Sequence, residues 1–545
     1  MIRIGNASGF YGDRASAWQE MLDGGDLDVL TGDYLAELTM LILGRDLMKD
    51  PSTGYAKTFL RQLEGILETA LAKGTRIVTN AGGLNPAGLA AAIEKLGDVK
   101  VAHVKVAHVT GDRVEDPTAL TANAYLGAFG IAECLAAGAD VVITGRVTDA
   151  SLVVGPAIAH YGWTRDDLDA LAGATVAGHI LECGAQATGG NFAFFTELPD
   201  GARRPGFPLA EVRRDGSAVI TKHPGTGGAV TVETVTAQLL YEIGAPQYLG
   251  PDVVAHFDTI RLSQEGPDRV LVDGVMGSPP PPTLKVGANR LGGFRNTMTF
   301  VLCGLQIEEK AALVRAQLED AIGADGLEFV LARTDHPDAA EEQAASALLA
   351  VHLKSPDQRR AGRAFSQAAV ELALASYPGL TLTAPPGDAT PFGVFSHHLV
   401  PQEAVGHVAV LPDGARRRIP PPPETAETVT RQAPTGARGP STTRAPFGTR
   451  FGARSGDKGG DANLGVWARD ADGWEWLRGF GTDELRELLP ETRDLAVERY
   501  ELPNLRAVNF VIRGILGQGV AASTRFDPQG KALGEWLRSR VVDLP

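Results

Sequence analysis

The 545-residue sequence contains only three cysteines, Cys134, Cys183 and Cys303, and they lie far apart in the chain. Such sparse and widely spaced thiols exclude a disulfide framework and a four-cysteine zinc site. No run of 18 or more apolar residues occurs, so we expect no membrane span. The N-terminus lacks the charged and apolar regions of a signal peptide, which predicts a cytoplasmic protein with reduced thiols.

Positively charged residues are fewer than negatively charged ones: the sequence has 51 Lys and Arg residues and 66 Asp and Glu residues, which gives a net charge of −15. This balance disfavours nucleic acid as a partner, since phosphate recognition needs a basic surface. Aromatic residues are scarce at 6%, whereas 65 glycines and 34 prolines are typical of a turn-rich α/β protein. A chain of this length is usually too long to fold around one hydrophobic core, so we expect several domains.

Short strand patterns alternate with amphipathic helix patterns in the N-terminal part of the chain. Residues 58–74 repeat apolar side chains at helical spacing and end on a glycine, whereas residues 100–106 are typical of a strand. Strand, helix and strand at this spacing predict βαβ units and a mainly parallel sheet. Hairpin signals after residue 192 predict a β-containing second lobe.

A domain boundary is expected in residues 411–447, where four consecutive prolines occur among Thr, Ala, Gly and Arg without apolar periodicity. We therefore predict an α/β main domain over residues 1–410 and a linker over 411–447. A small α+β domain of ferredoxin-like kind would follow over residues 448–545.

The segment AGHILECGAQATGGNF, residues 177–192, places His179, Glu182 and Cys183 within five residues. If the segment is helical, the three side chains lie on one face. A histidine oriented by a carboxylate can act in general acid–base catalysis, and a neighbouring thiol can act as a nucleophile or proton donor. The alternatives are a zinc site, which would need ligands from elsewhere, and a packed helix end with an inert cysteine.

The loop HPGTGG precedes a predicted helix and is a candidate anion site. Successive backbone N–H groups in a glycine-rich turn at a helix start can bind an anion, with side chains adding further bonds. The candidate residues are His223, Thr226, Gly227 and Gly228. The alternative is a tight turn without a ligand.

Two further loops follow predicted strands, where ligands bind to an α/β sheet. In TGRVTDAS, Arg146 is expected to clamp a carboxylate, and Asp149 to orient His179 or act as a base. The alternative is an Arg–Asp ion pair that only holds the loop.

The second of these loops is NAGGLNP. Its Asn80 is expected to donate to an oxyanion, while Gly82 and Gly83 let the backbone approach a ligand. The alternative is a simple strand-to-helix turn.

In the small domain, residues 448–469 concentrate charged side chains among several glycines. Arg454 and Lys458 are the candidates there for binding phosphate or carboxylate. The competing interpretation is a loop that docks this domain onto the main one.

Eight segments, in this order, resemble the acyclic terpene utilisation AtuA family over essentially the whole chain. They are IRIGNASGFYGDR, LTGDYLAELTM, IVTNAGGLNP, ITGRVTDASL, GHILECGAQATGGNF, GTGGAV, QLLYEIG and ARSGDKGGDANLGVW. The resemblance implies a main domain over residues 1–410 and a C-terminal ferredoxin-fold-like domain. It also implies a place in the degradation of citronellol and geraniol, whose intermediates are branched acyl-CoA thioesters. A 3-hydroxy-3-alkylglutaryl-CoA is the substrate suspected for the family.

Residues and resemblance together predict a lyase that cleaves a carbon–carbon bond in a 3-hydroxyacyl-CoA or branched hydroxy acid. Coenzyme A would enter as part of the substrate, and a divalent metal would assist by polarising oxygens, although no strong metal motif is present. The alternatives are an acyl-CoA hydratase or dehydratase and a non-catalytic partner in an enzyme assembly. We also expect a homo-oligomer.

Overall fold

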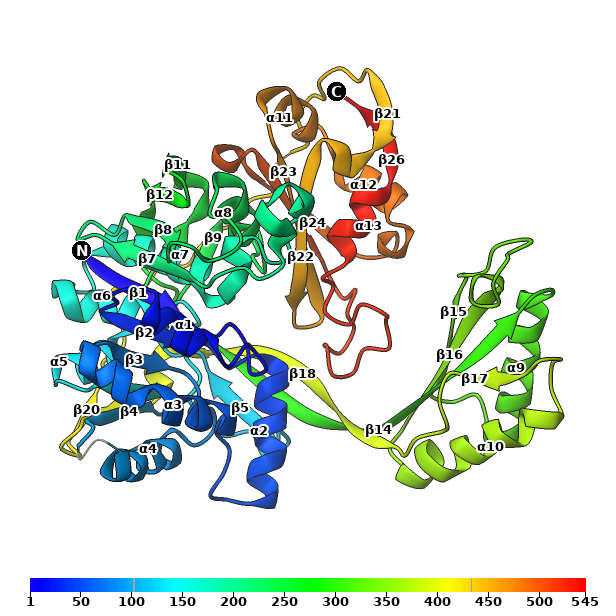
Figure 1. The fold of residues 1–545 in the computed structure, drawn as a ribbon, viewed down its shortest axis with the longest axis horizontal. Helices are drawn as coiled ribbons and strands as arrows, with labels where there is room; N and C mark the ends of the chain where they lie inside the picture. Colours follow the sequence, from blue (N-terminus) through cyan, green and yellow to red (C-terminus); the bar gives the residue numbers. More distant parts are fainter. Residues whose placement is uncertain (101–102, 433) are drawn as a thin grey trace. The chain divides into compact units, whose positions relative to one another are not determined.

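The computed structural model describes residues 1–100, 103–432 and 434–545, which fold into two compact units (Figure 1). The first unit consists of residues 1–289 together with 395–545, and the second consists of residues 290–394. The second unit is thus an insertion in the chain of the first. None of the helices in the described ranges is long and apolar enough to cross a lipid bilayer.

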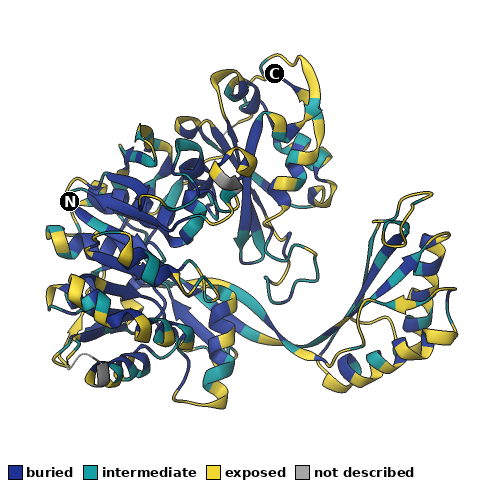
Figure 2. Ribbon diagram, viewed as in Figure 1, coloured by how far each residue is buried: buried dark blue, intermediate teal, exposed yellow. Residues whose placement is uncertain are grey.

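Five parallel strands form the centre of the main sheet in the first unit. In spatial order they are β1 (Ile2–Asn6), β2 (Val29–Gly32), β3 (Arg76–Thr79), β6 (Val141–Thr144) and β4 (Val106–Thr110). The helices between them are α1 (Ala17–Asp23), α2 (Glu37–Lys49), α3 (Lys57–Lys73), α4 (Pro86–Lys100) and α5 (Phe129–Ala136). Figure 2 shows these central strands as buried. The predicted βαβ units are therefore present.

Antiparallel strands extend this sheet on both sides, so the prediction of a mainly parallel sheet is correct only for its centre. On one side lie β7 (Pro208–Val212), β8 (Ala218–Lys222), β12 (Arg269–Asp273) and β11 (Arg261–Gly266), and on the other β19 (Val408–Val410) and β20 (Arg416–Arg418). Turns such as residues 213–217 are too short for a parallel crossover, so the strands they join must run antiparallel. The hairpin after residue 192 therefore belongs to the main sheet.

One strand prediction was misplaced along the chain. The strand expected at 100–106 begins only at Val106, because α4 continues to Lys100. Residues 101 and 102 of that prediction lie outside the described residues.

The most deeply buried helix is α7 (Leu168–Glu182), whose residues from Ala170 to Glu182 are all buried. Its many alanines and glycines let neighbouring elements approach on every side, which is typical of a helix inside a large core. Around it lie α6 (Ser151–Tyr161), α8 (Val232–Leu239) and a three-stranded sheet of β9 (Gln247–Leu249), β10 (Val254–His256) and β13 (Met276–Ser278). This packing brings the end of α7 close to the ends of the central strands.

The C-terminal part of the first unit is an antiparallel sheet with three helices, as the α+β prediction requires. The strand order is β22 (Phe451–Lys458), β23 (Asp461–Ala468), β25 (Ala507–Ile512) and β24 (Val497–Leu502), and the helices are α11 (Ala471–Leu477), α12 (Thr482–Leu488) and α13 (Leu533–Ser539). A separate pair joins β21 (Thr443–Pro446) to β26 (Val541–Leu544). Between β20 and β21 the described residues, which omit residue 433, contain no helix or strand.

The second unit has its own antiparallel sheet and its own hydrophobic core. Its strands come from β15 (Leu327–Ala332), β16 (Ser346–Ser355), β14 (Thr283–Cys303), β17 (Thr381–Leu382) and β18 (Thr390–Pro401), and its helices are α9 (Ile307–Ile322) and α10 (Phe365–Glu371). Phe300 and Phe365 are fully buried in its core. A β-containing lobe thus exists at residues 290–394, but not directly after residue 192 as predicted. The first part of β14 stays in the first unit, where it pairs with β5 (Thr121–Ala124).

Candidate functional site

The candidate site begins at the carboxyl ends of β2, β3 and β6, where ligands bind to parallel sheets. Asp33 and Asn80 directly follow β2 and β3, Arg146 lies two residues after the end of β6, and all three are buried. Asn80 Nδ2 donates a hydrogen bond to Asp33 Oδ1 over 2.6 Å, and Asn80 Oδ1 accepts one from the backbone of Tyr34 over 2.8 Å. Asn80 therefore ties two loops together and positions Asp33.

Gly82 and Gly83 pack against the protein's own backbone. A Cβ atom on Gly82 would lie 2.5 Å from the carbonyl oxygen of Thr144. Gly83 has φ +53°, and a Cβ atom there would lie 2.9 Å from the carbonyl oxygen of Gly54. The structure thus supports the interpretation of this segment as a strand-to-helix turn.

Arg146 is neutralised inside the protein. Its Nη1 atom donates to Asp149 Oδ1 over 2.5 Å and to the carbonyl oxygen of Leu35 over 3.3 Å. The guanidinium also lies over the ring of Tyr125, at 4.1 Å from the centroid. Asp149 retains 29% side-chain exposure, so this ion pair lies at an accessible part of the site.

The end of α7 places His179, Glu182 and Cys183 together, as the helical spacing predicts. His179 is completely buried, with its ring centroid 5.2 Å from that of Tyr248 and 5.4 Å from that of Phe257. Its Nδ1 atom lies 3.2 Å from Glu182 Oε1, but neither ring nitrogen has a hydrogen-bond partner of proper geometry.

The three side chains at this helix end are shifted toward their neutral forms. Burial, reinforced by Lys458, lowers the pKa of His179 to about 4. Burial and then Asp149 raise the pKa of Glu182 well above its usual value. Burial also raises the pKa of the Cys183 thiol, which disfavours the nucleophilic role because reactive cysteines need a lowered pKa.

The C-terminal sheet supplies Lys458 to the same region. Lys458 Nζ donates to the backbone carbonyl of Glu242, just after α8, over 2.5 Å. Burial and then Lys285 lower the pKa of Lys458, although Glu242 acts in the opposite direction. Lys458 therefore combines two properties. It docks the C-terminal sheet against the end of α8, and it is an amino group with a lowered pKa.

Further carboxyl groups surround Lys458. Burial and then the charge of Glu242 raise the pKa of Asp457 to about 8. Burial raises the pKa of Glu242, and Glu37 adds to that rise. For Glu37, burial acts to raise the pKa, but Lys285, whose Nζ lies 3.8 Å from Glu37 Oε1, and Arg146 together with weaker contributions lower it.

We call this set the acid–base cluster. It consists of Asp33, Glu37, Arg146, Asp149, Glu182, Glu242, Lys285, Asp457 and Lys458, whose charges influence one another. Asp33, Glu37, Glu242 and Lys285 were not predicted. Asp33 directly follows β2 and Glu37 begins α2 four residues later, which is a usable signal, whereas nothing local distinguishes Glu242 or Lys285.

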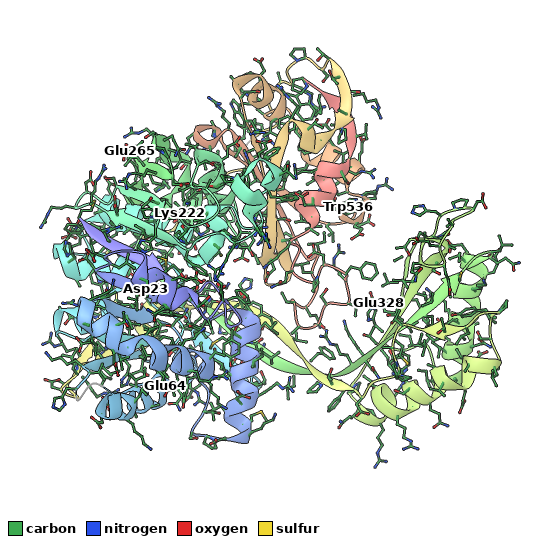
Figure 3. The ribbon with its side chains drawn as sticks, viewed as in Figure 1. Asp23, Glu64, Lys222, Glu265, Glu328 and Trp536 are labelled. Carbon is green, nitrogen blue, oxygen red and sulfur yellow. The ribbon has the colours of Figure 1, made fainter. Side chains whose placement is uncertain are left out.

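The HPGTGG loop is not linked to this cluster by any interaction among the described residues. His223 Nε2 lies 2.9 Å from the carbonyl oxygen of Met21, and the Thr226 hydroxyl donates to the carbonyl of His223. Lys222, labelled in Figure 3, binds the carbonyl of Thr226 over 2.7 Å and pairs with Asp268 over 3.0 Å.

N–H groups in and directly after this loop already have acceptors, because Thr226 donates to the carbonyl of His223 and Ala229 to the carbonyl of Thr188. Thr231 and Thr234 cap α8 reciprocally, and Asp268 accepts from the backbone of Val230. A Cβ atom on Gly227 or Gly228 would meet a carbonyl oxygen within 2.4 Å. These contacts support the tight-turn interpretation.

Within the described ranges, no group of three or more His, Cys, Asp or Glu side chains is arranged to hold a metal ion. The charged side chains of the candidate site are carboxyl, amino and guanidinium groups.

Two family models match the chain in sequence order. The model described as acyclic terpene utilisation family protein AtuA matches residues 2–411, and the AtuA ferredoxin-like domain matches residues 451–543. A search of curated proteins found no match. The first match contains most of the acid–base cluster, and the second contains Asp457 and Lys458.

Proposed function

The chain belongs to the acyclic terpene utilisation AtuA family, and from that premise we propose that it is a catabolic enzyme that cleaves a carbon–carbon bond in a 3-hydroxyacyl-CoA-type substrate. The family links the chain to acyclic terpene utilisation. The carbon–carbon lyase reaction and the thioester substrate are the new elements of the proposal.

The observation that supports this proposal is that the pKa values of Lys458 and Glu182 are shifted in opposite directions. Burial lowers the pKa of the lysine and raises the pKa of the glutamate, so burial favours the uncharged form of each. Groups whose environments push their pKa values in this way are suited to take and give protons under the same conditions. The rest of the acid–base cluster lies around them.

In the proposed reaction Lys458 acts as the base and Glu182 as the acid. Neutral Lys458 takes the proton of the substrate's 3-hydroxyl group, the bond between C2 and C3 breaks, and the C3 oxygen becomes a ketone. The bonding electrons pass to the thioester as an enolate, whose negative charge lies near Lys285 and the Arg146–Asp149 pair. Protonated Glu182 then gives its proton to C2 and releases the shortened thioester.

In this scheme Glu182 takes the acid–base role that the sequence predicts for His179. His179 has no exposed surface, and burial lowers its pKa to about 4, whereas Glu182 is 8% exposed. His179 then serves as packing beside Glu182.

The test is conversion of a branched 3-hydroxyacyl-CoA by the full chain, with products identified by mass spectrometry. A ketone and a shortened thioester support cleavage, whereas an unsaturated thioester of unchanged carbon count would establish the dehydratase alternative. The variants E182Q and K458M should abolish turnover, with K57M and E133Q as controls on partly exposed side chains outside the cluster. Absence of turnover with every thioester would leave the assembly-partner alternative.

A further inference from the structure

Arg454 stands out because it is buried without an acceptor. It lies in the middle of β22 and is only 7% exposed. Its Nη2 atom is buried and has no hydrogen-bond partner. Among the residues that the structure describes, no carboxylate forms an ion pair with its guanidinium.

The other two arginines that are buried in the described part of the chain show what a satisfied guanidinium looks like. Arg146 is paired with Asp149. Arg499 binds the carbonyl oxygens of Phe480 and Arg478 through Nε and Nη2, and Nη1 pairs with Glu501 over 2.8 Å. Arg454 is the exception.

Among the described residues, the one partner of its guanidinium is an aromatic ring. The guanidinium carbon lies 4.3 Å from the centroid of Tyr241, the residue before Glu242. A ring face attracts a cation but cannot accept the directed bonds of the guanidinium fork. A buried charge without such bonds is costly, and a bound anion would compensate that cost.

The position of Arg454 connects it to the acid–base cluster. Side chains alternate along a strand, so Arg454, Gly456 and Lys458 share one face of β22. That face meets the end of α8, because Gly456 approaches Tyr241 and Lys458 binds Glu242. Arg454 and Lys458 are four residues apart, about 13 Å along the strand.

We propose that Arg454 is the subsite for a free carboxylate group of the substrate. A carboxylate matches the single positive charge and can accept two parallel bonds from the guanidinium fork. A phosphate dianion would bring a second negative charge into a region already rich in carboxyl groups. The inference rests on the proposed function, because it places the carboxylate at one end of a substrate that reacts near Lys458.

The test measures binding of glutarate, acetate and inorganic phosphate to the full chain by calorimetry, without any reaction. Glutarate should bind the native protein, and R454M should weaken this binding at least about 30-fold, because a buried charged partner is removed. R454K, which keeps the charge but loses the fork, should be intermediate. R444M, a change on an exposed arginine of the same domain, should bind glutarate normally.

Thermal unfolding without ligand separates a ligand-binding arginine from a structural one. R454M should melt at or above the native temperature, because methionine keeps the contact with Tyr241 and removes an unpaired charge. R499M should melt lower, because it leaves buried carbonyl oxygens without donors. A low melting temperature for R454M, unchanged glutarate binding in R454M, or binding of phosphate alone would each overturn the proposal. Glutarate binding through Arg454 in a protein without thioester turnover would instead refute only the proposed reaction.

Discussion

Asn463 on β23 holds the backbone of Glu242 at the end of α8. Its Oδ1 atom accepts a hydrogen bond from the Glu242 N–H over 2.8 Å, while Lys458 binds the carbonyl oxygen of the same residue. Glu242 has φ +57°, a left-handed conformation that costs a residue other than glycine about 1 kcal/mol or more. The C-terminal sheet thus maintains the conformation that directs Glu242 into the acid–base cluster.

Replacing Asn463 with leucine should lower both stability and turnover. The change preserves size but leaves the Glu242 N–H, the Leu240 carbonyl and Asn509 Oδ1 without their partner. Unsatisfied buried groups of this kind should cost about 2–3 kcal/mol, measured by urea unfolding. The control is Asn504→Leu, which removes bonds to the carbonyl oxygens of Phe257 and Ile260. Equal turnover in the two variants would contradict a specific role for Asn463.

Asn463 also illustrates why part of the site was not predictable from sequence. Residues 448–469 were identified as a charged loop that would dock or bind a ligand, but its partner at Glu242 is more than 200 residues away. The QLLYEIG segment that contains Glu242 has an ordinary helical pattern. Only the packing of β22 and β23 against the end of α8 brings these residues together.

Local patterns predicted more where the geometry depends on nearby residues. The helical spacing placed His179 beside Glu182, and the strand-end loops placed Arg146 and Asn80 at the correct edge of the sheet. The same patterns do not reveal how a donor is used. Thr226, for example, donates its hydroxyl to the carbonyl of His223, within the loop that was predicted to bind an anion.

Gly456 should be required for the contact between the C-terminal sheet and α8. A Cβ atom at this position would lie 2.4 Å from Cε2 of the buried Tyr241 ring and 3.0 Å from Cγ of Glu242. Gly456→Ala should therefore lower the free energy of unfolding by about 1–3 kcal/mol, because the overpacked interface must separate.

The control for this variant is Gly65→Ala on the exposed side of α3, where a Cβ atom would have nothing within 4 Å. Alanine favours a helix over glycine by about 1 kcal/mol, so this change should stabilise the protein. A Gly456→Ala protein as stable as the native chain would show that the interface can adjust.

The pKa of Asp457 predicts a pH dependence of stability. Burial and Glu242 raise its pKa to about 8 in the folded protein, whereas an unfolded aspartate titrates near 4. The folded state therefore binds the extra proton between these values, and its contribution to stability, complete below pH ~4, is lost as pH rises toward 8.

Asp457→Asn should remove this dependence, because the amide imitates the protonated carboxyl group at every pH. Urea unfolding at pH 5 and pH 8 should show the variant gaining stability relative to the native protein as pH rises. The exposed Asp543→Asn change provides the control and should leave the difference between the two pH values unaltered. A native-like pH dependence in Asp457→Asn would mean that the carboxyl group is ionised in the fold.

Replacing His179 distinguishes a catalytic role for this residue from a purely packing role. Because neither ring nitrogen is properly bonded, His179→Leu should keep stability within about 1.5 kcal/mol while preserving most of the volume. Turnover should persist in His179→Leu and disappear in Glu182→Gln, since the proton donor in our scheme is Glu182.

Stability against pH gives an independent measurement on the same variant. The pKa of His179 is lowered to about 4 in the fold, whereas the unfolded value is near 6.5, so the unfolded chain binds the proton first as pH falls. The native protein should lose stability between pH ~6.5 and ~4 for this reason, and His179→Leu should lose less. A variant that lost turnover at least a hundredfold with unchanged stability would return the acid–base role to His179, because packing alone cannot produce that combination.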